Sequence, residues 1–259
     1  MDGAGLIEAV EILESNDKIA CVQSLWKPLK RFNNALSMAQ EQFHHLHIER
    51  EQVFKSRYDL WPIFNGAGAV WKRNVIEREC GGWMTRCVCE DTDISGYLNM
   101  RGYKIHVLPT WHTGIDLVYS WKEYGKQQRR WIQGNGQQVQ LHIRDSKGWG
   151  FKKLYWISWN LGFFIAPTKY VIPFVMGYKY FHGGCNAIEY LCVLPHLLVF
   201  IASGLTWDNK FWLRGWLTYP LHYLFEMGAL HWQIVGWWEG FLNYRKIFEF
   251  IVTKKEVKR

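Results

Sequence analysis

Residues 89–108 read CEDTDISGYLNMRGYKIHVL, which is one helix signal followed directly by one strand signal. Asp91–Arg101 predicts a helix, because carboxylates stand in its first turn and Gly102 lies where a C-cap residue is expected. Lys104–Leu108 is a short apolar run of strand length. A helix that leads straight into a strand is a building unit of α/β folds.

The same alternation of helix and strand patterns extends upstream of this unit. The predicted elements are helices at residues 5–15, 34–58 and 74–79, a strand at Lys18–Gln23, and a Gly-rich tight loop at Phe64–Val70. Apolar positions recur at helical spacing in the first helix, and the predicted strand is short and apolar. Together these elements predict an α/β domain in the first part of the chain.

The character of the sequence changes after residue 150. Residues 117–143 still predict an amphipathic helix, but residues 154–249 are rich in Trp, Tyr, Phe and Leu and contain few charges. Three apolar segments, 154–178, 187–205 and 216–242, are candidate membrane spans, and the second is the cleanest. Basic residues flank the region, as they do on the cytoplasmic side of membranes. The sequence therefore predicts a multi-pass membrane protein whose domain at 1–150 faces the cytosol.

Composition narrows the classes of partner. The 259 residues include 16 Trp and carry a formal charge of +8. The basic residues flank the apolar region and do not form a basic domain of their own, so no nucleic-acid partner is predicted. None of the six Cys has the spacing of a zinc site, which favours reduced, buried thiols. No apolar stretch typical of a secretory signal follows Met1.

Two short motifs carry the chemistry. Glu90 and Asp91 open the predicted helix, where the helix dipole favours carboxylates that can point into a cleft; charge compensation alone is the alternative. Gln127 and Arg130 are three residues apart, hence on one helical face, with Trp131 beside them. The Arg fork can bind a pyrophosphate and the Trp ring can stack on a sugar, although an interfacial helix anchored by Arg and Trp is the competing interpretation.

Two further segments are weaker signals. The loop Phe64-Asn65-Gly66-Ala67-Gly68 would let backbone approach a ligand closely, because glycine has no side chain. It lacks the strand–GxGxxG–helix arrangement of dinucleotide sites. The segment Phe250–Lys255 is, taken alone, a basic tail next to an apolar region.

Taken in order, these motifs resemble family 2 glycosyltransferases of the cellulose-synthase, mannan-synthase and β-glucan-synthase kind. The matching positions are Val22-Gln23, Phe64-Asn65-Gly66, Trp71-Lys72-Arg73, Gly81-Gly82-Trp83, Glu90-Asp91-x-Asp93, Arg101-Gly102-Tyr103, Gln127-x-x-Arg130-Trp131 and Phe250-x-Val252-Thr253-x-Lys255. The resemblance implies an α/β fold: a partial GT-A-type domain at residues 1–150 that ends in the Gln-x-x-Arg-Trp helix. Transmembrane and interfacial helices at 151–259, with a gating-like loop near the C-terminus, would follow.

The resemblance also implies roles for these residues in inverting transfer of a hexose from a nucleotide sugar to a growing β-glycan. Asp91, with Glu90 beside it, would be the catalytic base that deprotonates the acceptor hydroxyl. The implied donor-binding residues are Gln127, Arg130, Phe250, Thr253 and Lys255. The implied acceptor-binding residues are Trp131, Asn65 and Gly66.

The implied partners are a donor of the UDP-glucose or GDP-mannose class, a glycan acceptor, a lipid membrane of the Golgi or plasma membrane, and other synthase subunits. The family uses a divalent cation, Mg²⁺ or Mn²⁺, held by an Asp-x-Asp motif that precedes the helix starting here near Leu6. That motif is absent from this sequence. Three alternatives stay open: a fragment that is inactive alone, a catalytically inactive membrane subunit or scaffold, and a lipid glycosyltransferase of the ceramide type.

Overall fold

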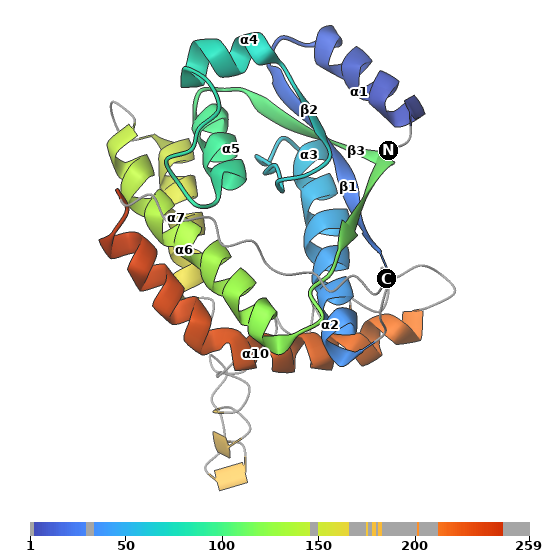
Figure 1. Ribbon diagram of the computed structural model, residues 1–259, viewed down its shortest axis with the longest axis vertical. Coiled ribbons are helices and arrows are strands. Elements are labelled where there is room, and N and C mark those ends of the chain that lie inside the picture. Colours follow the sequence, from blue (N-terminus) through green and yellow to red (C-terminus); the bar gives the residue numbers. More distant parts are fainter. Residues whose placement is uncertain are drawn as a thin grey trace.

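The computed structural model describes residues 3–29, 34–145, 150–165, 175, 178–179, 181–182, 201 and 212–245. Its described sheet has three strands in the order β2-β1-β3 (Figure 1). The central strand β1 (Ile19–Leu29) pairs antiparallel with β2 (Ala69–Trp71) and parallel with β3 (Lys104–Asp116). Helices cover both faces of this sheet, so the predicted α/β class is confirmed as a mixed α/β fold.

Both predicted strands exist, and both run further than predicted. Residues Ile19–Leu25 of β1 are buried in succession, as expected of a central strand. The predicted strand at 104–108 continues to Asp116 across a register shift, because Ser24 pairs with Leu108 while Leu25 pairs with His112. Pro109 lies in the displaced segment, where a residue without an N–H donor is tolerated.

The first helix packs against the sheet. Helix α1 (Gly3–Ser15) buries Ala9 and Leu13 against Val22 of β1 and Trp111 of β3. Gly5 allows this approach, since a Cβ at that position would lie 2.5 Å from Trp111 Cδ1.

A second helical run covers residues 35–57, which confirms the predicted long helix. It consists of α2 (Ala35–Phe43), a π-helical segment η1 (His44–Gln52) and α3 (Val53–Arg57). Asn34 caps it, because its side chain accepts a hydrogen bond from the backbone N–H of Ser37 at 2.8 Å. Ile48 packs against Leu25 and Val107 of the sheet.

The middle of the chain forms a third packed group. The predicted helix at 74–79 is α4 (Arg73–Val75) continued by η2 (Ile76–Cys80), and it ends at Gly81 with φ of 70°. Helix α5 (Glu90–Met100) is the predicted helix of the opening motif, and Gly102 follows it with φ of 91°. Val75 and Ile76 pack with Ile94 and Leu98 of α5 against Ala20 of β1.

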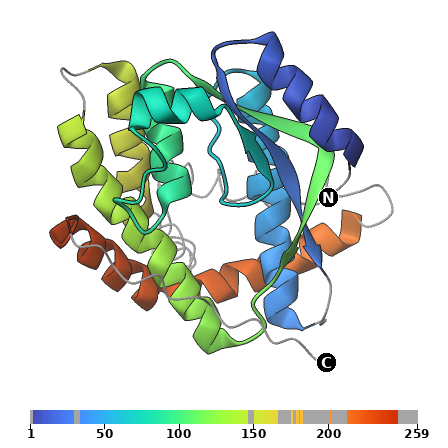
Figure 2. The same cartoon turned by 45° about the horizontal axis from the view of Figure 1, so that its top comes forward.

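The C-terminal helices pack on one another. Helix α6 (Trp121–Asp145) is followed by α7 (Phe151–Ile165), and α10 (Trp212–Leu242) lies along α6 and α2 (Figures 1 and 2). Four glycines let the backbones of α6 and α10 approach closely. A Cβ on any of them would overlap the opposite helix: Gly125, Gly136, Gly236 and Gly240.

The prediction of a multi-pass membrane protein is contradicted. Within the part of the chain that the structure describes, no helix is both long and apolar enough to cross a membrane. The predicted segment 216–242 belongs to α10, whose carboxylates face α6: Glu226 accepts a hydrogen bond from Tyr124, and Glu239 pairs with Arg129.

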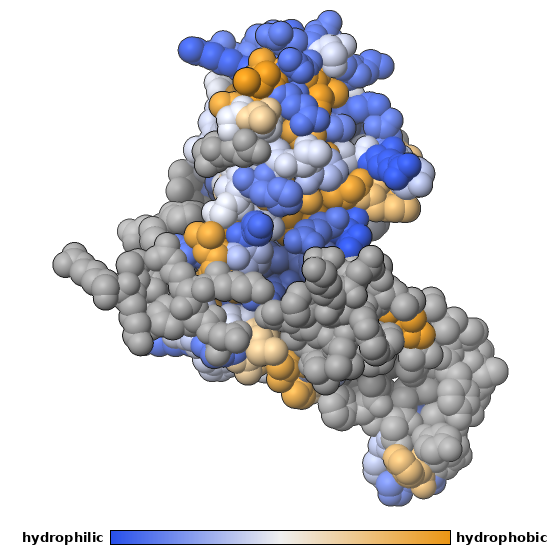
Figure 3. All heavy atoms as spheres, turned by 90° about the vertical axis from the view of Figure 1, so that its right-hand side faces the viewer, coloured by the Kyte–Doolittle hydropathy of each residue, from blue (hydrophilic) through white to orange (hydrophobic). Residues whose placement is uncertain are grey.

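The other two candidate spans are described only in part. Helix α7 has only 15 residues, and the remainder of segment 154–178 is described at few positions. The segment 187–205 lies outside the described residues except for Ile201. On the face shown in Figure 3, the coloured surface is mostly hydrophilic with apolar residues in small groups.

Candidate functional site

The start of α5 lies against the Gly-rich loop at residues 64–68. Asp91 is half-buried, and its Oδ1 accepts a hydrogen bond from the backbone N–H of Thr92 at 2.8 Å. Its other oxygen faces Gly66, because a Cβ built on that glycine would lie 2.7 Å from Asp91 Oδ2. The structure thus brings the predicted base and a predicted acceptor-binding residue together.

Side chains from β1 and α5 hold this loop in place. The Phe64 N–H donates to Ser95 Oγ at 2.9 Å, and Ser95 Oγ donates to the Asp91 carbonyl at 2.6 Å. On the other side, the Asn65 N–H donates to Gln23 Oε1 at 3.1 Å. Gln23 is fully buried in β1, so the loop is fixed to the sheet and to the helix that carries Asp91.

Replacing Gly66 with Ala should disturb this contact. Its φ of 87° disfavours any side chain, and the added methyl group would press on the Asp91 carboxylate. We expect the free energy of unfolding to fall by about 2–3 kcal/mol, measured by urea denaturation. Gly81→Ala is the matched control, because Gly81 has φ of 70° but open space around its Cβ position. Its loss should be about 1–2 kcal/mol; equal losses in the two variants would contradict the contact.

The environment of Asp91 tunes its acidity. Burial raises the pKa of its carboxyl group most, and the neighbouring Glu90 raises it further. The Thr92 backbone N–H and the Arg130 guanidinium act in the opposite direction, and the pKa settles at about 7. A carboxyl group with this pKa exchanges its proton readily at neutral pH, as a general base must.

Helix α6 places the second motif beside the first. Cys89, directly before α5, donates from Sγ to the carbonyls of Arg130 and Trp131, both at 3.7 Å. Gly134 makes this approach possible, since a Cβ there would lie 2.5 Å from Cys89 Sγ. Arg130 Nη1 lies 3.5 Å from the Val88 carbonyl, near enough to Asp91 for its charge to act on that pKa. The two motifs, 40 residues apart, therefore share one site.

Trp131 belongs to an aromatic row that the motif alone did not reveal. Its half-buried ring packs on Val88 and Cys89 and stacks on Phe43 of α2, with centroids 6.1 Å apart and planes at 27°. Phe43 stacks in turn on His47 at 5.2 Å. No sequence signal pointed to Phe43, because it is an ordinary apolar position in a long helix. Gln127 is half-buried one turn before Arg130, on the same face of α6.

The third acid of the first motif has a structural role. Asp93 is completely buried, and its two carboxylate oxygens accept hydrogen bonds from Nε and Nη2 of Arg86, at 2.8 and 3.0 Å. Arg86 also binds Asp145 at the end of α6, with Nη1 2.6 Å from Oδ1. This ion triad joins α5 to α6 and so holds the two motifs at a fixed distance. Sequence reasoning missed it, because the three residues span 59 positions.

Some predicted residues cannot be placed. Phe250, Thr253 and Lys255, the predicted donor-binding residues near the C-terminus, lie outside the described residues. Across the described segments, no three His, Cys, Asp or Glu side chains gather to hold a metal ion. The described residues therefore do not offer a site for the divalent cation that the resemblance implies.

Comparison with known proteins identifies related sequences. The model of the family described as "glycosyl transferase family group 2" matches residues 6–238. The "probable glucomannan 4-beta-mannosyltransferase 3" of Oryza sativa subsp. japonica is 24% identical over 260 residues, which cover 96% of this chain and 46% of the relative. The chain thus spans about half the length of the curated relative it matches.

Proposed function

Because the chain belongs to glycosyl transferase family group 2, as its motifs predicted, we propose that it transfers a hexose from a nucleotide sugar to a growing β-glycan. One observation carries this proposal. Asp91, with a pKa of about 7, lies where the loop at Gly66, the start of α5 and the part of α6 around Arg130 meet. A base and a cation beside each other are what glycosyl transfer from a diphosphate requires.

In the proposed reaction, the acceptor hydroxyl gives its proton to Asp91 while its oxygen attacks the anomeric carbon. The bond from that carbon to the diphosphate oxygen breaks, and the nucleoside diphosphate leaves with the electron pair. Attack from the side opposite the leaving group inverts the anomeric configuration. The Arg130 guanidinium, with Gln127 on the same face, stabilises the charge that develops on the leaving phosphates.

The same geometry divides the remaining roles. Glu90 keeps the pKa of Asp91 near neutrality through its negative charge. Trp131, extended by Phe43, offers an apolar platform for an acceptor sugar, and the fixed loop at Asn65 and Gly66 closes the side next to the base. Phe250, Thr253 and Lys255 are proposed to bind the donor because of the family resemblance alone. The proposed reaction does not include a step at a metal ion.

The donor is proposed to be of the GDP-mannose or UDP-glucose class. The similarity to the rice protein, described as a probable glucomannan 4-beta-mannosyltransferase, favours mannose. Incubating the chain separately with GDP-mannose and UDP-glucose, each with manno- and cello-oligosaccharides, tests this choice by product mass and anomeric NMR signals. We expect lengthened β-linked oligosaccharides, formed at least ten times more slowly by Arg130→Ala. No transfer by the folded chain would contradict the proposal and favour the inactive subunit. Transfer to ceramide instead would favour a lipid glycosyltransferase.

The pH profile is a separate prediction. A base must be unprotonated, so the transfer rate should rise about tenfold per pH unit below about 7 and level off above it. Glu90→Gln removes a charge that raises the pKa of Asp91, and the midpoint should therefore move to lower pH. Initial rates from about pH 5 to about pH 9 measure both effects. A rate independent of pH over that range would exclude Asp91 as the base.

A further inference from the structure

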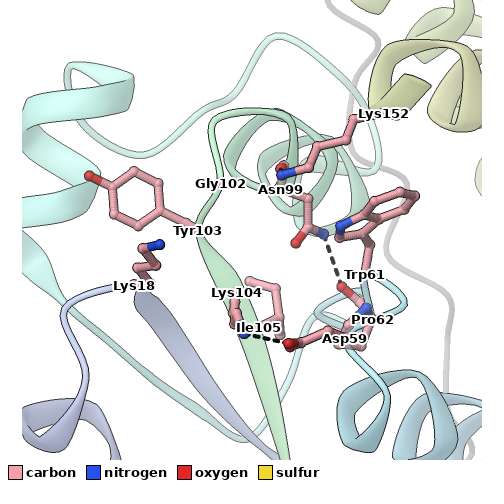
Figure 4. Close-up of a pocket in the computed structure, with 10 residues that line it drawn as sticks. All are labelled: Lys18, Asp59, Trp61, Pro62, Asn99, Gly102, Tyr103, Lys104, Ile105 and Lys152. Carbon is pink, nitrogen blue, oxygen red and sulfur yellow. Dashed lines mark hydrogen bonds and ion pairs between the residues drawn. The ribbon is translucent and has the colours of Figure 1, made fainter. Parts of the chain in front are cut away.

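An open cavity lies at the opposite end of α5 from Asp91. Its volume is about 310 Å³, and its wall includes Lys18, Asp59, Trp61, Asn99, Lys104 and Lys152 (Figure 4). Asn99 is eight residues after Asp91 in the same helix, which separates them by roughly 12 Å at 1.5 Å per residue. The cavity is therefore a different place from the site proposed for sugar transfer, and nothing in that reaction uses it.

The charges on its wall favour an anion. The wall contains three lysines and one carboxylate, Asp59. Asp59 is paired with Lys104, with Nζ 2.5 Å from Oδ2. Lys152 Nζ donates to the Asn99 backbone carbonyl at 3.3 Å. Lys18 is exposed at the start of β1 and makes no side-chain ion pair with the described residues. Lys18 and Lys152 thus have no carboxylate partner among the described residues, although Lys152 also lies over the Trp61 ring, 5.9 Å from its centroid.

A buried acceptor on the wall needs a donor. Asn99 is 1% exposed, and its Oδ1 accepts no hydrogen bond from the described part of the chain. Its orientation is fixed, because Nδ2 donates to the Pro62 carbonyl at 3.1 Å. Figure 4 shows Oδ1 turned away from Pro62, toward the side of the cavity where Lys104 and Ile105 lie. A hydroxyl group placed there would satisfy this acceptor, whereas a fully ionised phosphate oxygen would not.

The remaining wall suits a small ring. Trp61 is half-buried, and its ring meets that of Tyr155 edge-to-face with centroids 4.7 Å apart. Lys152 Nζ lies 5.9 Å from the centroid of the Trp61 ring, so the wall places an aromatic surface beside a positive charge. Gly102 contributes only backbone, and a Cβ there would meet open space. A volume of 310 Å³ is at the lower end of ligand sites, which suits a monosaccharide better than a nucleotide sugar.

We propose that this cavity is a binding site for a monosaccharide phosphate. The phosphate contacts Lys18 and Lys152, a sugar hydroxyl donates to Asn99 Oδ1, and the ring packs on Trp61. This inference does not rest on the function proposed for Asp91, because it uses none of the same residues. The proposed ligand would, however, contact Trp61, which lies four residues before Asn65 in the segment that leads into the loop at Asn65 and Gly66.

Titration of the purified chain with glucose 6-phosphate, followed by calorimetry and by the ³¹P NMR signal, tests the proposal. We expect saturable binding that Lys18→Ala combined with Lys152→Ala weakens at least about tenfold. Lys122→Ala is the matched control, since Lys122 is exposed on α6 away from the cavity; it should leave binding unchanged. Glucose and inorganic phosphate should each bind at least about tenfold more weakly than the sugar phosphate.

Three results would overturn the proposal. The first is binding that the double lysine variant leaves intact. The second is binding that Arg130→Ala abolishes, which would assign it to the transfer site. The third is inorganic phosphate binding as tightly as glucose 6-phosphate, which would leave a simple anion site. The lysines are exposed or half-buried, so their variants should fold; thermal unfolding of each checks this.

Discussion

Replacing Asp91 with Asn is expected to lower the rate of hexose transfer by about 10²- to 10⁴-fold, the usual contribution of a general base. The amide has nearly the same shape as the carboxyl group, so the loop at Gly66 and the hydrogen bond from Thr92 should persist. What the variant loses is the ability to take the acceptor proton. Its residual rate should therefore show no rise around pH 7.

The same substitution should stabilise the fold. The pKa of Asp91 is about 4 in the unfolded chain and about 7 in the folded protein. Protonated Asp91 therefore stabilises the folded state relative to ionised Asp91, and this stabilisation is present at low pH and is lost as pH rises toward 7. Asn resembles the protonated form at every pH. The unfolding temperature of Asp91→Asn should therefore exceed that of the wild type by an amount that grows between about pH 4 and about pH 8.

Initial rates and calorimetric melting of both proteins measure these effects. Glu90→Gln is the control, because it removes an adjacent carboxylate but should keep most of the activity above pH 7. Full activity of Asp91→Asn would remove Asp91 from the base role. A lower melting temperature at high pH would show that its ionised form is well accommodated in the fold.

Replacing Asp93 with Asn is expected to lower the free energy of unfolding by about 3 kcal/mol. Asp93 is completely buried, and its loss leaves Arg86 with a missing partner inside the α5–α6 contact. Removing one member of a buried pair typically costs about 3–5 kcal/mol, and the lower end applies because 28% of the Arg86 side chain is exposed.

Urea denaturation of the two proteins measures this loss. Asp17→Asn is the matched control: Asp17 is fully exposed and lies 3.4 Å from Lys72, so its pair should contribute less than about 1 kcal/mol. Equal losses in the two variants would show that the Arg86 triad is no more important than a surface pair. Because the triad joins the helices of both motifs, transfer activity should fall together with stability.

The local signals of the sequence predicted much of this fold. The carboxylates before Ile94 and the glycine after Arg101 predicted both ends of α5 to within one residue, since capping depends on adjacent residues. The continuation of β3 past Pro109 was missed, because it depends on a register shift against β1 that no local pattern encodes. The candidate site shows the same division: the sequence pointed to residues within one motif, whereas Phe43 and Arg86 are brought beside those motifs only by the tertiary fold.

The membrane prediction failed for a related reason. A run of aromatic residues such as 216–242 shows only that much apolar surface must be covered, not what covers it. On one side of α10 the cover is protein, as Trp237 packs with Ile132 and Val139 of α6, whereas Leu224, Ile234 and Trp238 are exposed. Glu226 and Glu239 interrupt the apolar run in the sequence, and both bind side chains of α6.

The close backbone contact of α6 and α10 has a consequence for how the protein is made. Gly136 of α6 packs against the backbone at Trp237, about one hundred residues later in the chain. During synthesis from the N-terminus, Gln127, Arg130 and Trp131 emerge long before the helix that supports them. A gene with a premature stop codon between α6 and α10 would thus still encode every described residue of the proposed site. The truncated chain would lack the helix that holds α6 in place.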